Sequence, residues 1–379
     1  MTDLLVVAGE ASGDRAAAPV VARLEGARAF GLGGPALAGV GLELVADMRA
    51  STALGIGEAA QRAVSVWRAW RAIVAASRER RPRAALLVNY TEFNARLAPR
   101  LHAAGVRVLW YGAPQVWAWR PARVESLKPH IDKMALMLPF EEPIWRASGV
   151  DAHYVGHPAF ETTPLDRKTA RHALGMTPFA AAFAVLPGSR PHEVRRLLVP
   201  MLDAYERVRR DRASVDARVL MAASLDEGTR AWARTTAAAR HVSTVDVDPY
   251  GGAMAVLGAF DVALCASGTV TLEAALARAV PVVAYRVGLA TEIAARAFVH
   301  TPHVALPNVL LRRCAFTELL QREACADRIA DALSDALDRQ TELRAACDEV
   351  ESVFGSARAP SASVARMLAP WIDVRLRAA

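Results

Sequence analysis

Nine short apolar runs, separated by longer and more polar stretches, constrain the fold of this chain most strongly. Predominantly apolar runs of roughly four to eight residues are typical of strands buried on both faces of a parallel sheet. The stretches between them repeat apolar residues every three or four positions, most clearly in residues 191–210, which predicts helices on both faces of the sheet. The runs are residues 4–8, 84–88, 106–110, 134–138, 180–186, 217–223, 242–247, 261–265 and 280–285.

The chain has 379 residues, which is too long for one ordinary domain at roughly 100–200 residues each. The strand and helix pattern is interrupted in residues 158–169, where prolines and polar residues replace it. We therefore predict an α/β protein with two doubly wound parallel-sheet domains facing a central cleft. The predicted domains are residues 1–160 and 168–345, and a helical segment, 346–379, packs back on the body. An exchange of this segment with a second copy, which would give a homodimer, stays open.

The net positive charge does not by itself indicate a nucleic-acid partner. The chain has 46 Lys and Arg against 39 Asp and Glu, a net charge of +7, but only three of the basic residues are lysines. Abundant arginine and alanine are what a GC-rich genome produces. No basic stripe interleaved with aromatic residues is present, so no nucleic-acid partner is expected.

Targeting and cysteine patterns favour the cytoplasm. No apolar run reaches the roughly 18 residues of a membrane-spanning helix, and the first residues lack the basic start of a signal peptide. The four cysteines are scattered without C-x-x-C pairing, which indicates reduced thiols and no zinc site.

Two glycine-rich segments follow early strands. Residues 9–14 read G-E-A-S-G-D, and residues 31–35 read G-L-G-G-P. Ligands of doubly wound sheets bind at the carboxyl ends of strands, where glycine lets the backbone come close. The alternative is a turn followed by a capped helix, and spacing alone does not decide between the two.

The second half carries two stronger signals for an anion. Residues 186–190, L-P-G-S-R, follow one strand and open a helix, so free N–H groups, a hydroxyl and a guanidinium should converge there. Residues 266–269, A-S-G-T, follow another strand and open a helix that carries Glu273. Ordinary helix capping is the alternative for either segment alone.

A metal site is not expected. Asp246 and Asp248 have the D-x-D spacing of metal-dependent sugar transferases, but with the aspartate content of this chain about one such triplet arises by chance.

A basic amphipathic helix is expected in residues 62–81. Its apolar residues share one face, with arginines around them, which is typical of a helix lying on an anionic membrane surface. The alternative is that the tryptophans are core residues and the arginines a solvated face. The predicted membrane-contact residues are Val66, Trp67, Trp70, Ile73 and Val74.

Eight motifs in register resemble the lipid-A-disaccharide synthase family, and the strings V-W-A-W-R and L-P-G-S-R are close to diagnostic. The resemblance runs from about residue 4 to about residue 325. Its motifs are residues 9–14, 31–34, 113–120, 138–141, 155–158, 186–190, 266–273 and 306–308.

The resemblance implies a GT-B fold of two Rossmann-like domains. It also implies an inverting transfer that joins UDP-2,3-diacylglucosamine to 2,3-diacylglucosamine 1-phosphate, giving the β(1→6) disaccharide of lipid A and UDP. No cofactor or divalent ion is required, because helix N-termini and arginine neutralise the leaving group. The expected location is peripheral, on the cytoplasmic face of the inner membrane.

The resemblance also implies the site residues. The expected residues of the UDP-sugar site are Gly188, Ser189, Arg190, Ser267, Gly268, Thr269, Glu273, Asn308 and Gln321. Those expected to line the acceptor side, in the N-terminal domain, are Glu10, Asp14, Trp117, Trp119, Arg120 and His157.

One departure from the family pattern concerns the catalytic base. The family segment I-D-A-P-D-F-N corresponds here to residues 88–94, V-N-Y-T-E-F-N, so Asn89 replaces the aspartate expected to act as base. An amide cannot take up the proton. Glu92 replaces the second aspartate and is the first alternative base, followed by Asp14, Glu10 and His157.

Two other functions stay open. One is a different GT-B transfer to a lipid-linked acceptor, such as addition of N-acetylglucosamine to a lipid-linked muramyl peptide, although the W-A-W-R tract argues against it. The other is a catalytically weakened homologue that binds lipid precursors, for which the Asn89 substitution argues.

Overall fold

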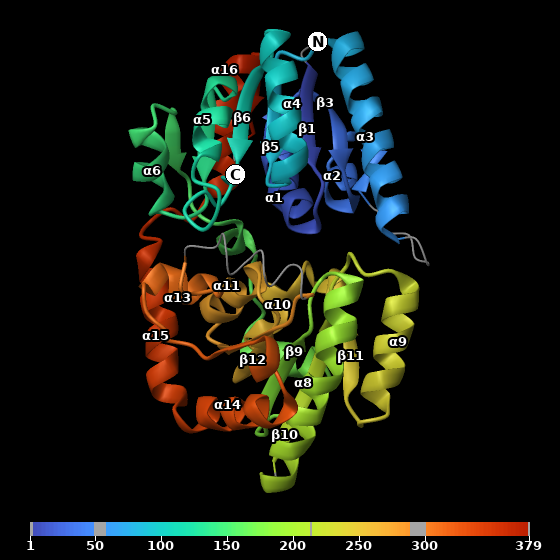
Figure 1. Ribbon diagram of the computed structural model, residues 1–379, viewed down its shortest axis with the longest axis vertical. Helices are drawn as coiled ribbons and strands as arrows, with labels where there is room; N and C mark the ends of the chain where they lie inside the picture. The colour runs from blue at the N-terminus through green and yellow to red at the C-terminus, as the bar shows by residue number, and fades with distance from the viewer. Residues whose placement is uncertain (1–2, 49–57, 213, 289–300, 378–379) are drawn as a thin grey trace. The chain divides into compact units, whose positions relative to one another are not determined.

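The computed structural model describes residues 3–48, 58–212, 214–288 and 301–377, which form two compact units (Figure 1). Unit 1 comprises Met1–Glu161 and Ser356–Ala379, and unit 2 comprises Thr162–Gly355. The boundary falls inside the predicted break at residues 158–169. The C-terminal segment, predicted as one piece over residues 346–379, is divided between the two units. Residues up to 355 belong to unit 2, and only residues 356–379 belong to unit 1.

Unit 1 is built on a seven-stranded sheet in which all neighbouring strands are parallel. The strand order is β4 (Glu43–Asp47), β3 (Arg28–Gly33), β1 (Asp3–Ala8), β5 (Ala84–Val88), β6 (Arg107–Tyr111), β7 (Lys133–Leu136), β8 (Ala152–Tyr154). Its helices are α1 (Ala11–Ala22), α2 (Pro35–Gly39), α3 (Glu58–Arg80), α4 (Thr91–Ala103), α5 (Arg123–Leu127), α6 (Glu141–Ala147) and α16 (Pro360–Ile372), with short 3₁₀ turns at Lys128–His130 and Pro158–Glu161.

Two hydrophobic cores cover the two faces of this sheet. Because successive strand residues point to opposite faces, Leu5 and Val7 of β1 lie in one core while Leu4 and Val6 lie in the other. Helices α3, α4, α5 and α6 contribute to the first core, and α1, α2 and α16 to the second. The apolar run of β1 is thus buried on both sides, which confirms the doubly wound prediction.

The C-terminal segment completes unit 1. Helix α16 packs on α1, and Val364 and Leu368 are fully buried in the second core. After α16 the chain forms β15 (Arg375–Leu376), which pairs antiparallel with β2 (Leu24–Glu25). The segment therefore packs back on its own chain.

Unit 2 repeats the architecture with a six-stranded parallel sheet. The strand order is β11 (Ser243–Asp246), β10 (Val215–Met221), β9 (Ala181–Leu186), β12 (Val262–Cys265), β13 (Val280–Tyr285), β14 (Glu318–Leu320). Its helices are α7 (Arg167–Ala173), α8 (Pro191–Asp211), α9 (Glu227–Ala238), α10 (Ala253–Leu257), α11 (Thr269–Leu276), α13 (Leu306–Leu311), α14 (Ala326–Asp338) and α15 (Gln340–Val353), with 3₁₀ turns at Asp248–Tyr250 and Gln321–Glu323.

Each sheet reverses its winding direction once. In unit 1 the chain builds outward from β1 to β3 and β4 and then returns to place β5 beside β1, with Ala8 level with Val88. In unit 2 it builds outward from β9 to β10 and β11 and returns to place β12 beside β9, with Leu186 level with Cys265. In doubly wound sheets, ligands bind beyond the carboxyl ends of the two strands at this switch point.

Candidate functional site

Four of the sequence motifs fall at the two switch points. Residues 9–14 and 88–94 follow β1 and β5 in unit 1, and residues 186–190 and 266–273 follow β9 and β12 in unit 2. Each unit therefore brings a pair of motif loops side by side at the carboxyl edge of its sheet.

The two glycine motifs of unit 1 are joined by Asp14. Its carboxylate accepts backbone N–H bonds from Gly34 at 2.7 Å, Ala36 at 2.9 Å and Leu37 at 3.2 Å, and the residue is only 3% exposed. These amides begin α2, where helical N–H groups lack partners within the helix. A Cβ on Gly34 would lie 2.8 Å from Asp14 Oδ2. Asp14 therefore anchors the start of α2, and its assignment to the catalytic groups stays a prediction.

The turn after β5 has an unusual backbone. Asn89 and Tyr90 both have left-handed conformations, with φ of 46° and 37°. Such values are uncommon outside glycine, and for a bulky residue such as tyrosine they mark strain that often occurs at functional sites. Neighbouring glycines give the turn its room, since a Cβ on Gly112 would lie 2.1 Å from Asn89 Oδ1 and one on Gly9 2.3 Å from the Tyr90 ring. Asn89 thus lies at the switch point, at the place predicted for the base.

Glu92 lies in the first turn of α4 and is exposed. Its Oε1 accepts a hydrogen bond from Arg123 at 2.5 Å and lies 3.7 Å from Arg120. The guanidinium of Arg120 also lies 4.5 Å from the centre of the Trp119 ring. The structure thus brings Glu92 together with two predicted acceptor-side residues. Glu10, at the N-cap of α1, is also exposed.

Glu141 is a functional candidate that the sequence reasoning missed. The residue begins α6, just beyond the carboxyl end of β7, and is buried. Trp117 donates its indole N–H to Glu141 Oε1 at 3.0 Å, and its ring meets Phe140 edge-on. Burial raises the pKa of Glu141 to about 7, although the hydrogen bonds from Trp117 and the Leu138 backbone act against the shift. The L-P-F-E motif was the available signal, but only burial shows why its carboxyl group matters.

His157 is buried and neutral near pH 7. Burial lowers its pKa to about 4, and its Nδ1 accepts the backbone N–H of Ala159 at 3.1 Å. Gly156 before it cannot carry a side chain, because a Cβ there would lie 2.2 Å from the carbonyl oxygen of Ala357. The motif thus also joins the C-terminal segment to the sheet of unit 1.

The L-P-G-S-R loop of unit 2 already binds an anionic side chain of the protein, Glu193. Glu193, in the first turn of α8, accepts the backbone N–H groups of Ser189 at 3.2 Å and Arg190 at 3.3 Å. The prediction of free N–H groups at this helix start is therefore wrong for these two amides. The Arg190 guanidinium also reaches Glu193 at 3.3 Å but is about half exposed, so it can still meet a ligand.

The second loop of unit 2 follows β12. Ser267 donates its hydroxyl to the carbonyl of Val304 at 3.1 Å, and Gly268 is the N-cap of α11 without a side-chain cap. Thr269 begins the helix and Glu273 lies one turn inside it. Since β12 neighbours β9, this helix start lies next to the loop that contains Arg190.

Two predicted donor-site residues are internal braces. Asn308 is fully buried, donates to Phe316 O and to Glu318, and accepts the N–H groups of Ala315 and Phe316. The amide group of its side chain is thus fully used inside unit 2, and its assignment to the UDP-sugar site stays a prediction. Gln321 Oε1 accepts the N–H of Val287 at 2.9 Å.

The D-x-D segment has a structural explanation. Asp246 pairs with Arg230 and Arg234 of α9, and Asp248 lies 3.7 Å from Arg230. Within residues 3–48, 58–212, 214–288 and 301–377, no group of three or more His, Cys, Asp or Glu side chains is placed to hold a metal ion.

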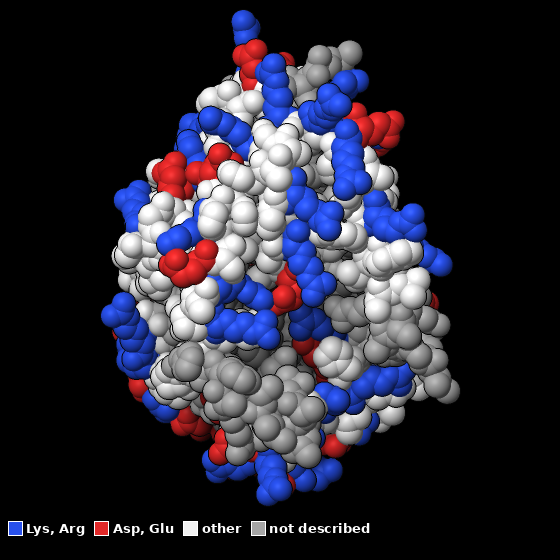
Figure 2. Space-filling model, turned by 45° about the horizontal axis from the view of Figure 1, so that its top comes forward, with Lys and Arg blue, Asp and Glu red and all other residues white. Residues whose placement is uncertain are grey.

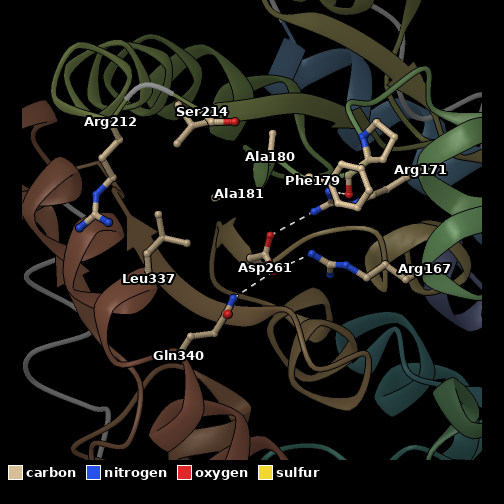
Figure 3. A pocket seen from close by; sticks show the side chains of 12 residues that line it. Arg167, Arg171, Phe179, Ala180, Ala181, Arg212, Ser214, Asp261, Leu337 and Gln340 are labelled. Atoms are coloured by element: carbon tan, nitrogen blue, oxygen red, sulfur yellow. Dashed lines mark hydrogen bonds and ion pairs between the residues drawn. The ribbon is translucent and has the colours of Figure 1, made fainter.

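A cavity of about 430 Å³ lies at the opposite, amino-terminal edge of the unit 2 sheet (Figure 3). Its polar centre is Asp261, which accepts hydrogen bonds from Arg167 at 2.7 Å, Arg171 at 3.2 Å and Gln340 at 3.0 Å. Arg171 donates its other N–H groups to backbone carbonyls. This edge lies at the opposite end of the strands from the switch-point loops, and Arg167 and Arg171 hold α7 to the sheet while Gln340 holds α15.

Most of the predicted membrane face of α3 belongs to the core. Ile73 is fully buried, so its prediction as a membrane contact is wrong. The Trp70 ring packs edge-on against Phe93 with centroids 5.3 Å apart. The same core receives Val66, Trp70 and Val74. The amphipathic pattern of α3 therefore marks the side of the helix that packs on the sheet.

The outer side of α3 keeps one large aromatic residue. Trp67 is 54% exposed and Val64 is 45% exposed, and the guanidinium of Arg71 lies 4.8 Å from the Trp67 ring centre. Arg68 is exposed beside them. Figure 2 shows Lys and Arg side chains over much of the face it presents, with Asp and Glu among them. Of the helices whose residues are described, none is both long and apolar enough to cross a membrane.

The two doubly wound sheets and the paired loops define the chain as a protein of the GT-B fold class. Solved structures agree on the fold. MurG from Acinetobacter baumannii matches with a TM-score of 0.54 at 13% identity, over 98% of this chain and 100% of that one. A UDP-GlcNAc 2-epimerase from Neisseria meningitidis, solved with UDP-GlcNAc bound, matches with a TM-score of 0.69 at 9% identity, over 97% and 100%.

Sequence comparison gives the family. Residues 4–369 match the family described as lipid-A-disaccharide synthetase. Lipid-A-disaccharide synthase from Anaeromyxobacter dehalogenans (strain 2CP-C) is 40% identical over 95% of both chains, and that from Myxococcus xanthus is 39% identical over 97% and 98%. The chain belongs to the lipid-A-disaccharide synthase family and is a glycosyltransferase. This confirms the sequence-based identification of fold, family and enzyme class.

Proposed function

We propose that the protein transfers 2,3-diacylglucosamine from its UDP donor to the 6-hydroxyl of 2,3-diacylglucosamine 1-phosphate, releasing UDP. One observation carries this proposal. Two family segments of each unit, residues 9–14 and 88–94 and residues 186–190 and 266–273, lie at the switch point of its sheet, where doubly wound folds bind ligands.

Unit 2 binds the donor in this proposal. Arg190, on the loop after β9, meets the diphosphate, and the start of α11 at Gly268 and Thr269 lies on the adjacent strand end. A guanidinium and a helix N-terminus both stabilise the negative charge that develops on departing UDP. Glu273, one turn inside α11, accepts hydrogen bonds from the ribose hydroxyls. This chemistry requires no divalent ion.

Unit 1 binds the acceptor and supplies the base. Among the carboxylates of unit 1, Asp14 is used by the start of α2 and Glu141 is buried, whereas Glu10 and Glu92 are exposed. Of these two, Glu92 lies on the segment after β5 in which the family pattern has its base. Asn89 stands at the strained turn three residues earlier and cannot accept the proton. We therefore assign proton removal from the acceptor hydroxyl to Glu92. Arg120 and Trp119, beside Glu92, contact the acceptor.

The acylated substrates reach the protein from a membrane surface. We assign this contact to the outer side of α3, where Val64 and Trp67 are exposed beside Arg68 and Arg71. An exposed aromatic residue among cationic side chains is suited to the interface of an anionic membrane. The inner-membrane face is the surface that carries these substrates.

An assay with both purified lipid substrates tests the proposal. Formation of the disaccharide 1-phosphate together with UDP is the expected result. UDP binding without product would instead support a catalytically weakened homologue, which the amide at Asn89 favours. Transfer of N-acetylglucosamine to a lipid-linked muramyl peptide would show that the acceptor is misassigned.

A further inference from the structure

A buried carboxylate lies inside the loop that is proposed to meet the donor diphosphate. Glu193 is only 4% exposed, although it belongs to the first turn of a surface helix, α8. A buried carboxylate is costly unless its oxygens are hydrogen-bonded. Its contacts therefore show what the carboxylate does there.

Both carboxylate oxygens of Glu193 point back into the loop. Oε2 accepts the N–H groups of Ser189 at 3.2 Å and Arg190 at 3.3 Å, and Oε1 lies 3.3 Å from the Arg190 guanidinium. Gly188 lies against the Glu193 side chain, since a Cβ there would lie 2.5 Å from Oε2, and its φ is 125°. The glycine of the L-P-G-S-R motif is thus required by Glu193.

The loop is also held from a neighbouring strand. Ser224, beyond the end of β10, donates its hydroxyl to the carbonyl of Ser189 at 2.8 Å. Tyr285, which ends β13, is near enough to Glu193 to sense its charge, because burial first, and then the charge of Glu193, raise the pKa of Tyr285. The Glu193 carboxylate therefore remains an anion beside the loop after β9.

We propose that Glu193 is the positioning residue of the donor site, which fixes the loop of residues 188–190 and orients the Arg190 guanidinium toward the diphosphate. This proposal rests on the proposed function, because it assumes that UDP binds at this loop. Glu193 does not contact the ligand. It takes up two loop amides and part of the charge of Arg190, and leaves the exposed part of that guanidinium for the diphosphate.

A helix cap without any role in binding is the competing explanation. A glutamate at the third helical position often accepts the N-cap amide, and such caps stabilise a protein without touching function. Asp226 provides a matched case in the same unit, since it caps α9 by accepting the N–H of Thr229 at 2.7 Å. Asp226 makes no contact with the loop of residues 188–190 among the hydrogen bonds described for it.

The experiment compares Glu193→Ala, Glu193→Gln and Asp226→Ala in the full chain. UDP affinity is measured by calorimetry at a temperature at which thermal melts show every variant folded. We expect Glu193→Ala to weaken UDP binding about tenfold, which is about 1.4 kcal/mol, because the loop must be ordered by the ligand. Glu193→Gln keeps an acceptor for the amides but loses the charge, and we expect about a threefold loss. Asp226→Ala should lower the melting temperature and leave UDP affinity unchanged.

Steady-state kinetics provide a second readout. If Glu193 positions the donor loop, Glu193→Gln raises KM for the UDP-sugar and leaves KM for the acceptor unchanged. Because glutamine is a mild change, this variant also carries the test if Glu193→Ala does not fold.

The outcomes separate this proposal from the proposed function. Wild-type binding of UDP with unchanged affinity in both Glu193 variants would overturn the positioning role and leave the function standing. Equal losses in Asp226→Ala and Glu193→Ala would overturn it too, because any loss of a cap would then suffice. No UDP binding by the wild type would overturn the proposed function, and this inference with it.

Discussion

The two switch points share one geometry but differ in chemistry. Each lies between neighbouring parallel strands, β1 and β5 in unit 1 and β9 and β12 in unit 2. The loops of unit 1 carry carboxylates and a strained turn at Asn89 and Tyr90, whereas those of unit 2 carry Arg190 and an open helix start at Gly268. The same edge can therefore serve an acceptor that must lose a proton and a donor that must lose an anion.

The two regions also differ in how a buried carboxylate is used. Asp14 reaches across the sheet edge to the start of another helix, about twenty residues later. Glu193 folds back on the loop of its own helix. Long-range capping fixes how strands and helices are arranged, and local capping fixes one loop. Variants of the two units test whether the carboxyl edge of the unit 1 sheet is a proton-handling edge and that of the unit 2 sheet an anion-handling edge.

Glu92→Gln should have the largest effect. The amide keeps the shape of the side chain but cannot accept a proton, so turnover should fall by about 10²–10⁴-fold. UDP binding should be unchanged, because the loops proposed to bind the donor lie in unit 2. Turnover with both lipid substrates and UDP calorimetry measure the two effects.

Two further variants check that the Glu92→Gln effect is chemical. Glu125→Gln changes an exposed carboxylate of unit 1 that pairs with Lys128, and should leave turnover unchanged. Asn89→Asp restores the carboxylate of the family pattern and should raise turnover. Should Glu92→Gln and Asn89→Asp both behave as wild type, neither position holds the base, and Glu10 or His157 takes its place.

Asp14→Ala should cost unit 1 much of its stability. It leaves three amides at the start of α2 without their acceptor, and we expect a loss of about 3 kcal/mol in the free energy of unfolding. Asp166→Ala, which removes the exposed N-cap of α7 in unit 2, should cost clearly less. Urea denaturation measures both, and equal losses would show that Asp14 is an ordinary cap.

Much of the fold could be predicted because buried parallel strands appear in the sequence as short apolar runs. All nine apolar runs overlap strands, including β9 and β12 at the switch point. The strands β3, β4, β8 and β14 were not predicted. β3 contains two glycines, β4 lies at the edge of its sheet and is only partly buried, and β8 and β14 are three residues long. Short or edge strands bury too little apolar surface to leave a run.

The sequence predicted which segments form the site, but not which contacts their side chains make. The motifs pointed to Asp14 and Asn308 but not to Glu193, and they did not show that each of the three accepts backbone N–H groups. A carboxylate that binds substrate and one that caps a helix have the same sequence signature, because both follow a strand and a glycine. Only burial and partners distinguish them.

Glu141→Gln should change how stability depends on pH. The pKa of Glu141 is raised from 4.5 to about 7 by burial, so the folded state binds its proton more tightly than the unfolded state does. The contribution of Glu141 to the free energy of unfolding is therefore fully present below about pH 4.5 and is lost as the pH rises through 7. The shift corresponds to about 3 kcal/mol at 1.36 kcal/mol per pH unit.

The measurement is urea denaturation of Glu141→Gln and wild type at pH 5 and pH 8. Relative to wild type, the variant should gain stability between the two values, because glutamine has no proton to lose. Glu142→Gln is the control, since Glu142 is the neighbouring residue and pairs with Arg146 at the surface. An identical pH dependence of Glu141→Gln and wild type would mean that Glu141 does not titrate in this range.

Arg190→Ala should weaken UDP binding by about 1.5–3 kcal/mol, the value of a charge-assisted hydrogen bond. Arg195→Ala is the matched control on the same helix, because that guanidinium lies over Trp232 at 4.8 Å. Calorimetry in the presence and absence of EDTA measures both effects. Unchanged affinity in Arg190→Ala, or loss of wild-type binding in EDTA, would remove arginine from its role at the anion-handling edge.

Trp67→Ser should have the smallest effect, and it asks whether only unit 1 meets the membrane. Trp67 is half exposed on the outer side of α3, so its loss should cost about 1 kcal/mol of binding, or roughly fivefold in sedimentation with anionic liposomes. Trp232→Ser in unit 2 is the matched control, because each ring lies 4.8 Å from an arginine guanidinium, Arg71 or Arg195. Trp70 is unsuitable as a test, since it packs on Phe93 and its loss would disturb the core. If Trp67→Ser sediments like wild type while Trp232→Ser does not, the contact lies on unit 2 and the acceptor is delivered elsewhere.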